Sequence, residues 1–253
     1  MWSFWLRLNW NAYILRSMFF PNDLFPIHDF SHASLWSEKG FVWEALTHLE
    51  NYLKKFSYKI KTQIPTQVYL ENKECIFIGE GTTIDPGVMI QGPCIIGKNC
   101  SIRHGAFLRG SVILGDGCVV GHGSELKNTI LLNGAKVAHL CYVGYSIVGP
   151  NTNLGAGVKC SNLRLDLREV SISCDGKKIK TGLKKLGAIF GEGVQVGCNC
   201  VLNPGTVIGK KSEIFPLLNV GGYVPPHSRV KSLRNWTIEP KAEEILQKMI
   251  YLT

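Results

Sequence analysis

Two cationic side chains lie at a spacing that suits an anion. Arg109 and Lys127 are 18 residues apart, and each directly follows an aliphatic residue, Leu108 or Leu126. In a chain that coils with 18 residues per turn, both would occupy the same position on adjacent coils, ~4.8 Å apart. Two stacked cations repel by roughly 3 kcal/mol at an effective dielectric constant of about 20, and a bound phosphate would turn this repulsion into attraction. The pair predicts a phosphate site, with a solvated surface pair as the alternative.

A histidine follows these cations at a second informative place. His139 begins the run HLCYVG, and the regular spacing of aliphatic residues slips by one residue near Val143. A lone histidine is most often structural, but a break in a regular repeat can open a groove. Histidine titrates close to neutral pH and can accept the proton of an attacking amine. His139 is therefore the candidate general base.

A repeat of six residues determines the elements that must position these side chains. Aliphatic residues recur at every sixth position, and the rhythm returns from Phe190 to Val220 after an interruption. The first stretch consists of Ile78, Ile84, Ile90, Ile96, Ile102, Leu108, Leu114, Val120, Leu126 and Leu132. Neither the helical period of 3.6 nor the strand period of 2 fits this spacing. Three six-residue faces make an 18-residue coil with the aliphatic residues stacked inside. The sequence predicts an all-β solenoid, a left-handed parallel β-helix of hexapeptide repeats.

Two flanking segments are expected to cap this solenoid, which spans residues 76–230. Residues 1–75 form an N-terminal extension with a predicted helix over 41–56, where apolar residues recur at helical spacing. Residues 231–253 contain a second predicted helix, over 240–251. A solenoid cannot bury the ends of its core alone, so short helical caps at both ends are expected.

An inserted segment interrupts the repeat over residues 160–189. Val170, Ile172 and Cys174 alternate with polar residues up to Asp175-Gly176, which predicts a β-hairpin with a type I′ turn. The cationic residues of the segment are Arg164, Arg168, Lys177, Lys178, Lys180, Lys184 and Lys185. The segment is either a solvated loop or part of the site, and its place directly after the His139 region favours the site.

The net charge and the cysteine content limit which binding partners and which cellular compartment are expected. The net charge of +9 favours acidic partners, such as phosphorylated metabolites, CoA, nucleic acid or anionic lipid. The nine cysteines are odd in number, and Cys94, Cys100 and Cys118 follow the repeat rather than a disulfide framework. Packed thiols of this kind are expected in a reducing, cytoplasmic environment. The aromatic residues within 1–20 are interrupted by polar ones, so no membrane span is expected there. An interfacial anchor, a contact with a neighbouring subunit and a start codon assigned upstream of Met18 stay open as interpretations.

In these motifs the chain resembles a known family. The stretch 127–166 holds the run HLCY at 139–142 and the run NLRLD at 162–166. It resembles the acetyltransferase half of the bifunctional bacterial enzyme that acetylates glucosamine 1-phosphate and then uridylylates it, and also archaeal-type sugar-1-phosphate nucleotidylyl/acetyltransferases. The resemblance covers roughly residues 76–230. It implies N-acetylation of an amino-sugar 1-phosphate by acetyl-CoA and a homotrimer with sites between subunits, with no role for nucleic acid.

The resemblance also implies roles for individual residues. His139 corresponds to the general base, and the CoA pantetheine would run along the backbone near Gly155 and Ala156. The sugar-phosphate contacts fall on Arg109, Lys127, Tyr142, Asn153 and Asn162, and a family lysine near the insertion falls on Arg168. Two features depart from the family. Tyr145 stands where an aspartate is common, and the 75 residues before the solenoid are too short for a nucleotidyltransferase domain, so no nucleotidyl transfer is expected.

Direct acetyl transfer in a ternary complex is the expected route, because no cysteine stands where an acyl-enzyme would need one, and no metal is required. Two other classes of function stay open. A γ-carbonic-anhydrase-like metalloenzyme is one, because His104 and His122 are 18 residues apart, His139 lies a further 17 on, and three histidines could bind Zn²⁺. The other is a non-catalytic protein that retains only sugar-phosphate binding.

Overall fold

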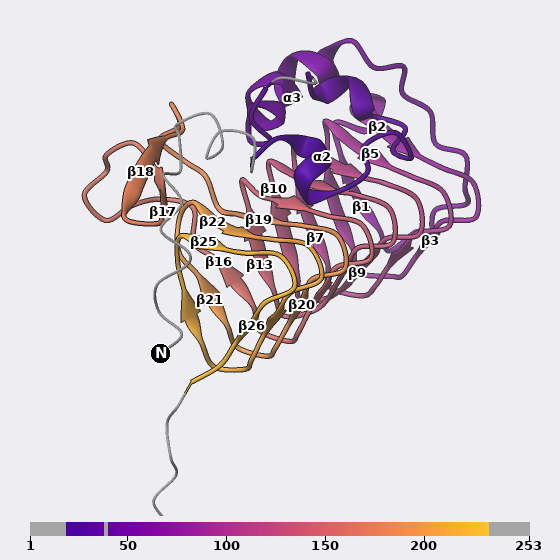
Figure 1. Cartoon of the computed structure of the whole chain (residues 1–253). Coiled ribbons are helices and arrows are strands. Elements are labelled where there is room, and N and C mark those ends of the chain that lie inside the picture. The colour runs from indigo at the N-terminus through magenta and orange to yellow at the C-terminus, as the bar shows by residue number, and fades with distance from the viewer. Residues whose placement is uncertain (1–18, 38–39, 233–253) are drawn as a thin grey trace, which may run out of the picture.

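The computed structural model describes residues 19–37 and 40–232, and three parallel eight-stranded sheets dominate it (Figure 1). Each coil adds one strand to each sheet in turn, so the sheets form the three faces of a prism. The predicted parallel β-helix is confirmed.

Sheet 1 consists of β1 (Tyr69–Glu71), β4 (Met89–Gln91), β7 (Phe107–Arg109), β10 (Glu125–Lys127), β13 (Tyr142–Gly144), β16 (Lys159–Cys160), β21 (Val201–Leu202) and β24 (Asn219–Val220). Sheet 2 consists of β2 (Ile76–Ile78), β5 (Cys94–Ile96), β8 (Val112–Leu114), β11 (Thr129–Leu131), β14 (Ile147–Val148), β19 (Ala188–Phe190), β22 (Thr206–Ile208) and β25 (Tyr223–Val224). Sheet 3 consists of β3 (Thr83–Ile84), β6 (Ser101–Ile102), β9 (Val119–His122), β12 (Lys136–His139), β15 (Asn153–Leu154), β20 (Gln195–Val196), β23 (Glu213–Ile214) and β26 (Arg229–Val230).

The inward side chains of the three sheets form one apolar core. All predicted core positions from Ile78 to Leu126 lie in it, as do those from Phe190 to Val220. The prediction for Leu132 is wrong. Leu131 pairs with Leu114 and lies in the core, whereas Leu132 belongs to a second apolar cluster outside the prism. The register has therefore shifted by one residue before Leu131.

The shift arises at the corner between sheets 1 and 2, which we call the variable corner. Two residues, Gly110 and Ser111, join β7 to β8 there, but Asn128 alone joins β10 to β11. Asn128 turns the chain in the left-handed region, with φ 48°. In the next coil the corner is equally short and Tyr145 takes the place of Asn128, with φ 52°. The slip predicted near Val143 is therefore two slips, and the first occurs at Asn128.

The variable corner also carries the insertion, residues 161–187. Its β17 (Ser171–Cys174) and β18 (Lys177–Lys180) form an antiparallel hairpin that projects from the prism (Figure 1). Asp175 and Gly176 both have positive φ, 47° and 75°, as a type I′ turn requires. The predicted hairpin is confirmed.

The outer face of sheet 2 is covered by the N-terminal part of the chain. This part contains α2 (Pro21–Leu24), η1 (Ala33–Leu35) and α3 (Glu44–Lys54), and α3 lies within the predicted span 41–56. Leu49 and Leu53 of α3 belong to the same buried cluster as the outward-facing Ile95, Ile113 and Ile130 of sheet 2. We call residues 19–58 the N-terminal cover.

Residues 60–68, and not α3, pack against the N-terminal end of the prism core, because α3 lies on the side of the prism. Ile60, Ile64 and Val68 pack against that core, and η2 (Lys73–Cys75) leads into β2. Among the described residues, no helix is long and apolar enough to cross a lipid bilayer. The predicted helix over 240–251 and all but the last two of residues 1–20 lie outside the described residues.

Candidate active site

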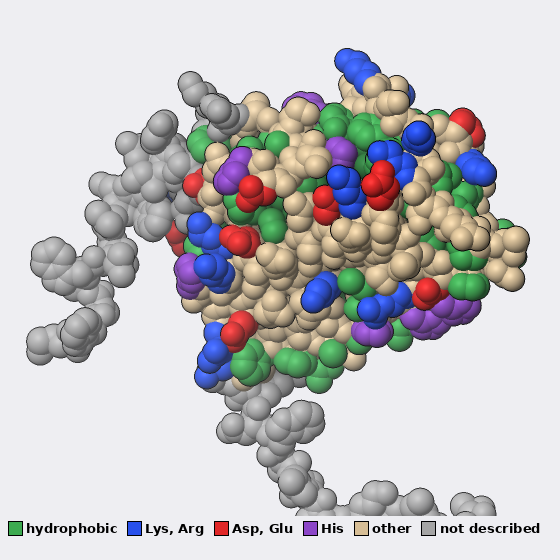
Figure 2. All heavy atoms as spheres, turned by 90° about the vertical axis from the view of Figure 1, so that its right-hand side faces the viewer, with side chains coloured by type: hydrophobic (Ala, Val, Ile, Leu, Met, Phe, Trp, Pro, Cys, Tyr) green, Lys and Arg blue, Asp and Glu red, His purple; other side chains and the backbone are tan. Residues whose placement is uncertain are grey.

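The corner between sheets 3 and 1 carries His104, His122 and His139 one above another, and we call it the histidine corner. β9 and β12 pair so that His122 and His139 are in register. The backbone N–H of Gly157 donates to the carbonyl of His139 at 3.0 Å, which places Ala156 next in the same column. Figure 2 shows histidine side chains gathered along one lower edge of the molecule. The predicted base and the predicted CoA contacts Gly155 and Ala156 thus lie on neighbouring coils.

The three histidines differ in what they contact. The rings of His104 and His122 are parallel, with centroids 5.7 Å apart. Their Nδ1 atoms donate to the carbonyls of Pro86 and His104, at 2.6 and 3.0 Å. Within residues 19–37 and 40–232, the exposed His139 side chain has no hydrogen bond, ion pair or ring contact. Both ring nitrogens of His139 are therefore free to exchange a proton with a ligand.

Within the described residues of one chain, these histidines do not come together as a set of metal ligands. In the described part of the chain, no three His, Cys, Asp or Glu side chains lie close enough to hold a metal ion. The Zn²⁺ alternative required His104, His122 and His139 to converge on one point. Because two of the rings stack in parallel with their Nδ1 atoms bound to backbone, these three residues give that alternative no support.

The thiol two residues after the predicted base, that of Cys141, makes contacts typical of a structural residue. Cys141 is buried, and its Sγ donates to the carbonyls of His139 and Gly155, at 3.1 and 3.3 Å. Burial raises the pKa of this thiol, so the thiolate that an acyl-enzyme would need is disfavoured. Cys141 therefore joins the turns of two adjacent coils.

The two cations on sheet 1 lie level on adjacent strands, as their spacing predicts, but they have different surroundings. Leu108 pairs with Leu126, so Arg109 and Lys127 are side by side. Arg109 Nη1 lies 2.8 Å from Glu125 Oε1, and this hydrogen bond raises the pKa of the guanidinium. The Lys127 side chain has no such partner among the described residues. An arriving anion would meet a free ammonium at Lys127, but at Arg109 it would compete with Glu125.

Two further predicted residues, Tyr142 and Asn162, contact each other beside sheet 1, whereas Asn153 lies on sheet 3. Asn162 Nδ2 donates to the Tyr142 hydroxyl at 3.1 Å, beside β10. Asn153 lies on sheet 3, where it pairs with Lys136 and Gln195. Within one chain, the candidate residues therefore form two groups on different sides of the prism. Sheet 1 has Arg109, Lys127, Tyr142 and Asn162, and the sheet 3 side has His139, Asn153, Gly155 and Ala156.

The insertion brings Lys185 to the variable corner, beside sheet 1. The Nζ of Lys185 lies 5.4 Å from the centre of the Tyr145 ring. Tyr145 in turn donates its backbone N–H to the carbonyl of Lys127 at 2.8 Å. Leu163 pairs with Lys185, so the two ends of the insertion close against each other there. Lys185 is the last cationic residue before β19, the strand on which the repeat resumes, and this position could have indicated it in the sequence.

Arg168, on which a family lysine near the insertion falls, lies in a separate exposed turn. Asp166 accepts hydrogen bonds from Arg164 Nε at 2.8 Å and from the backbone N–H of Arg168 at 3.2 Å. The neighbouring Arg164 guanidinium holds the pKa of Asp166 well below its usual range. Residues 164–168 thus form a turn held by Asp166, and no contact among the described residues joins the Arg168 side chain to sheet 1.

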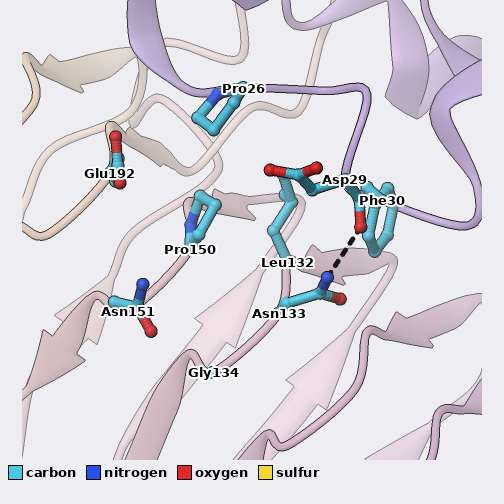
Figure 3. A pocket seen from close by; sticks show the side chains of 9 residues that line it. All are labelled: Pro26, Asp29, Phe30, Leu132, Asn133, Gly134, Pro150, Asn151 and Glu192. Atoms are coloured by element: carbon cyan, nitrogen blue, oxygen red, sulfur yellow. Dashed lines mark hydrogen bonds between the residues drawn. The ribbon is translucent and has the colours of Figure 1, made fainter.

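Three cavities of the described chain lie away from His139. One of about 240 Å³ lies between the N-terminal cover and the corner joining sheets 2 and 3, with Asp29, Phe30, Asn133 and Glu192 in its lining (Figure 3). There Asn133 Nδ2 donates to the carbonyl of Asp29 at 2.8 Å. His139 stands on an open surface, so a single described chain does not enclose it.

Comparison with known proteins identifies the family. A family model described as the GMPPB C-terminal domain matches residues 90–213. The chain is 33% identical over 192 residues to "Uncharacterized acetyltransferase YaiX" of Escherichia coli strain 536, covering 75% of this chain and 84% of that protein. The chain belongs to the hexapeptide-repeat acetyltransferases.

Longer members of this acetyltransferase family match as well. "Bifunctional protein GlmU" of Methanococcus maripaludis is 39% identical over 188 residues, which are 74% of this chain and 45% of that protein. "Bifunctional sugar-1-phosphate nucleotidylyltransferase/acetyltransferase" of Sulfurisphaera tokodaii is 42% identical over 85 residues, 34% of this chain and 21% of that protein. The chain thus spans less than half the length of these relatives.

A solved structure of perosamine N-acetyltransferase from Caulobacter crescentus, in complex with CoA and GDP-perosamine, is also similar. It shares 18% identity and a TM-score of 0.27, covering 70% of this chain and 60% of that one. Similarity at this level is too low to transfer a ligand or a residue role to this acetyltransferase.

Proposed function

We propose that this acetyltransferase transfers the acetyl group of acetyl-CoA to the amine of an amino-sugar 1-phosphate, with His139 as general base. The observation that carries the proposal is the contrast within the histidine corner. His104 and His122 use Nδ1 on backbone carbonyls, whereas His139 keeps both ring nitrogens free beside the Ala156 turn. A general base needs an accessible imidazole within reach of the reacting amine.

The transfer itself would need a base and a donor for the thioester oxygen. As the amine nitrogen bonds to the carbonyl carbon, its proton passes to His139, the C–S bond breaks and CoA leaves as a thiolate. The N–H groups of Gly155 and Gly157 already donate to Val196 and His139. The N–H of Ala156 has no partner among the described residues, so it can donate to the oxyanion.

The acceptor would be held on sheet 1 through its phosphate. Lys127 offers an unpaired ammonium, Lys185 lies over the neighbouring Tyr145, and Arg109 can join when the anion displaces Glu125. A charge-assisted contact to phosphate is stronger than a neutral hydrogen bond. The name of the Sulfurisphaera relative, which includes sugar-1-phosphate, supports the same acceptor class.

The two groups of candidate residues lie on different sides of the prism, so we propose that a complete site is shared between subunits of a homotrimer. The N-terminal cover occupies the outer face of sheet 2, which leaves sheets 1 and 3 for subunit contacts. Light scattering on the full chain should give a trimer. A monomer at micromolar concentration would contradict the shared site.

The acceptor class can be tested by release of the CoA thiol. Acetyl-CoA would be supplied with glucosamine 1-phosphate, with glucosamine, and with a UDP-amino sugar, and the acetylated product identified by mass spectrometry. We expect the highest kcat/KM with the 1-phosphate, because removal of the phosphate leaves Lys127 without its anion. Equal turnover of glucosamine would contradict the phosphate site. Binding of the 1-phosphate without thiol release would instead favour a non-catalytic sugar-phosphate-binding protein.

A further inference from the structure

A lysine on sheet 1 bridges the two corner turns that the proposed reaction uses. Lys159 Nζ donates to the carbonyl of Leu140 at 2.8 Å and to that of Gly157 at 3.0 Å. Leu140 directly follows His139, and Gly157 directly follows Ala156. One ammonium therefore spans the backbone beside the candidate base and the backbone beside the candidate oxyanion donor.

This bridge is a local device and not a property of the repeat. The residues that occupy the same column on the other strands of sheet 1 are Tyr69, Met89, Phe107, Glu125, Tyr142, Val201 and Asn219. Lys159 is the one cation in that column of described residues. It stands at the coil from which a long side chain reaches the turns of both His139 and Ala156.

Of the two turns that Lys159 joins, the turn at Leu140 depends more on such a hydrogen bond than the turn at Gly157. Corresponding positions on neighbouring coils are glycines, Gly105, Gly123 and Gly157, all with positive φ. Leu140 adopts φ 52° there, and a side chain in this region costs about 1–2 kcal/mol relative to glycine. The Leu140 side chain is 56% exposed, so packing contributes little to holding the turn. A hydrogen bond to the Leu140 carbonyl restrains the backbone next to His139.

We infer that Lys159 is a positioning residue, which holds the His139 turn against the Ala156 turn so that base and oxyanion donor face the same reacting centre. This inference rests on the proposed function. Lys159 acts through the two carbonyls and does not itself exchange a proton with the substrate. Misplacement of a catalytic group by about 1 Å can lower a rate by about 100-fold, so loss of the bridge should be measurable.

The kinetic test uses Lys159→Met, which keeps the length of the side chain but removes its donors. We expect kcat to fall about 10- to 100-fold with little change in KM for the sugar phosphate. Lys159→Arg should recover much of the loss, because it restores a donor. Lys98→Met is the matched control, since Lys98 is an exposed lysine on the corner between sheets 2 and 3 and should leave kcat unchanged.

A double-mutant cycle shows whether the effect passes through His139. Adding Lys159→Met to His139→Ala should lower kcat much less than it does in the wild-type chain, because the base that it positions is already gone. An equally large loss in both backgrounds would overturn the inference.

Hydrogen exchange tests the bridge without any assay of turnover. In Lys159→Met, the amides of Leu140 and Gly157, which donate to His122 and His139, should exchange faster, while Lys98→Met should not change them. Unchanged protection in Lys159→Met would overturn the inference even in an inactive protein. Faster exchange without acetyl transfer by the wild type would retain the bridge and refute the proposed function alone.

Discussion

Sheets 1 and 2 are built from the same six-residue rhythm, and their outer faces differ. Sheet 2 turns Ile95, Ile113, Ile130 and Ile147 outward, and all four are buried under the N-terminal cover or beside it. Sheet 1 turns outward the polar and aromatic side chains that form the candidate phosphate site. The inward side chains of both sheets belong to one core.

The outer faces of sheets 1 and 2 therefore have different roles. Aliphatic side chains on both faces of sheet 2 bury area that stabilises the fold, at about 25 cal/mol for each Å² of apolar surface. Sheet 1 leaves its outer face uncovered among the described residues, and around Arg109 and Lys127 that face is charged and available to ligands. Substitutions at the candidate site on sheet 1 should therefore change the kinetic constants but not the free energy of unfolding. Substitutions under the N-terminal cover should change the free energy of unfolding but not the kinetic constants.

The largest kinetic effect is expected at the histidine corner. His139→Ala should lower kcat by about 10²–10⁴, because the attacking amine loses its general base. His122→Ala is the matched control on the same corner and should keep kcat close to the wild-type value. Steady-state kinetics and thermal melts on both variants check this. A folded His139→Ala protein with near-wild-type kcat would remove His139 from the mechanism.

The largest effect on stability is expected under the N-terminal cover. Leu49 of α3 is fully buried, and Leu49→Ala should lower the free energy of unfolding by about 2–5 kcal/mol. Thr47→Ala, at an exposed position of the same helix, should change it by less than about 0.5 kcal/mol. Urea unfolding measures both. If Leu49→Ala lowered kcat at a temperature where the protein stays folded, the separation of the two faces would be wrong.

Acid should weaken the cover through His32. Burial lowers the pKa of His32 from 6.5 to about 4, and its Nδ1 lies 2.7 Å from the Tyr52 hydroxyl. Between pH 6.5 and about pH 4, His32 binds a proton in the unfolded chain but stays neutral in the folded chain. Stability is therefore fully present above pH 6.5 and is lost as the pH falls towards 4, by about 3 kcal/mol in total.

The variant His32→Gln checks this dependence, because it has no group that titrates in that range. Its free energy of unfolding, measured at pH 7 and at pH 5, should fall less than that of the wild type. An identical fall in both proteins would show that His32 does not cause the acid sensitivity.

The smallest expected effect compares the two cations of sheet 1. Lys127→Ala should raise KM for the sugar phosphate by about 10- to 150-fold, because a charge-assisted contact contributes about 1.5–3 kcal/mol. Arg109→Ala should raise KM less, since its guanidinium already pairs with Glu125. In a Glu125→Gln background the Arg109 effect should grow. A larger effect of Arg109 than of Lys127 in the wild-type background would contradict this order.

The inward positions of the fold could be predicted because they depend on local periodicity. A position such as Leu108 is buried by its own coil and its neighbours, which repeat the same spacing. The error at Leu132 arose because Asn128 closes a corner alone, and asparagine is also common at corners of normal length. The cover of sheet 2 could not be predicted, since it depends on contacts between distant segments such as Leu49 and Ile113.

The sequence could predict the candidate site only where the position of a residue depends on the regular spacing of the coils. The 18-residue spacing placed Arg109 beside Lys127, whereas His139 pairs with His122 at a spacing of 17 because the corner at Asn128 is one residue shorter. The pairing of Arg109 with Glu125 depends on side-chain conformation, which spacing does not specify. Lys185 reaches Tyr145 because the two ends of a long insertion close at one point, and the length of that insertion conceals the contact in the sequence.

The most direct test of the central claim is the ratio of kcat for the wild type to kcat for His139→Ala, measured by thiol release with glucosamine 1-phosphate from pH 6 to pH 9. A general base matters most where the amine is protonated, and less where free amine is already abundant. We expect a ratio of about 10² or more near neutral pH that narrows towards pH 9. A ratio close to one at every pH would contradict the account.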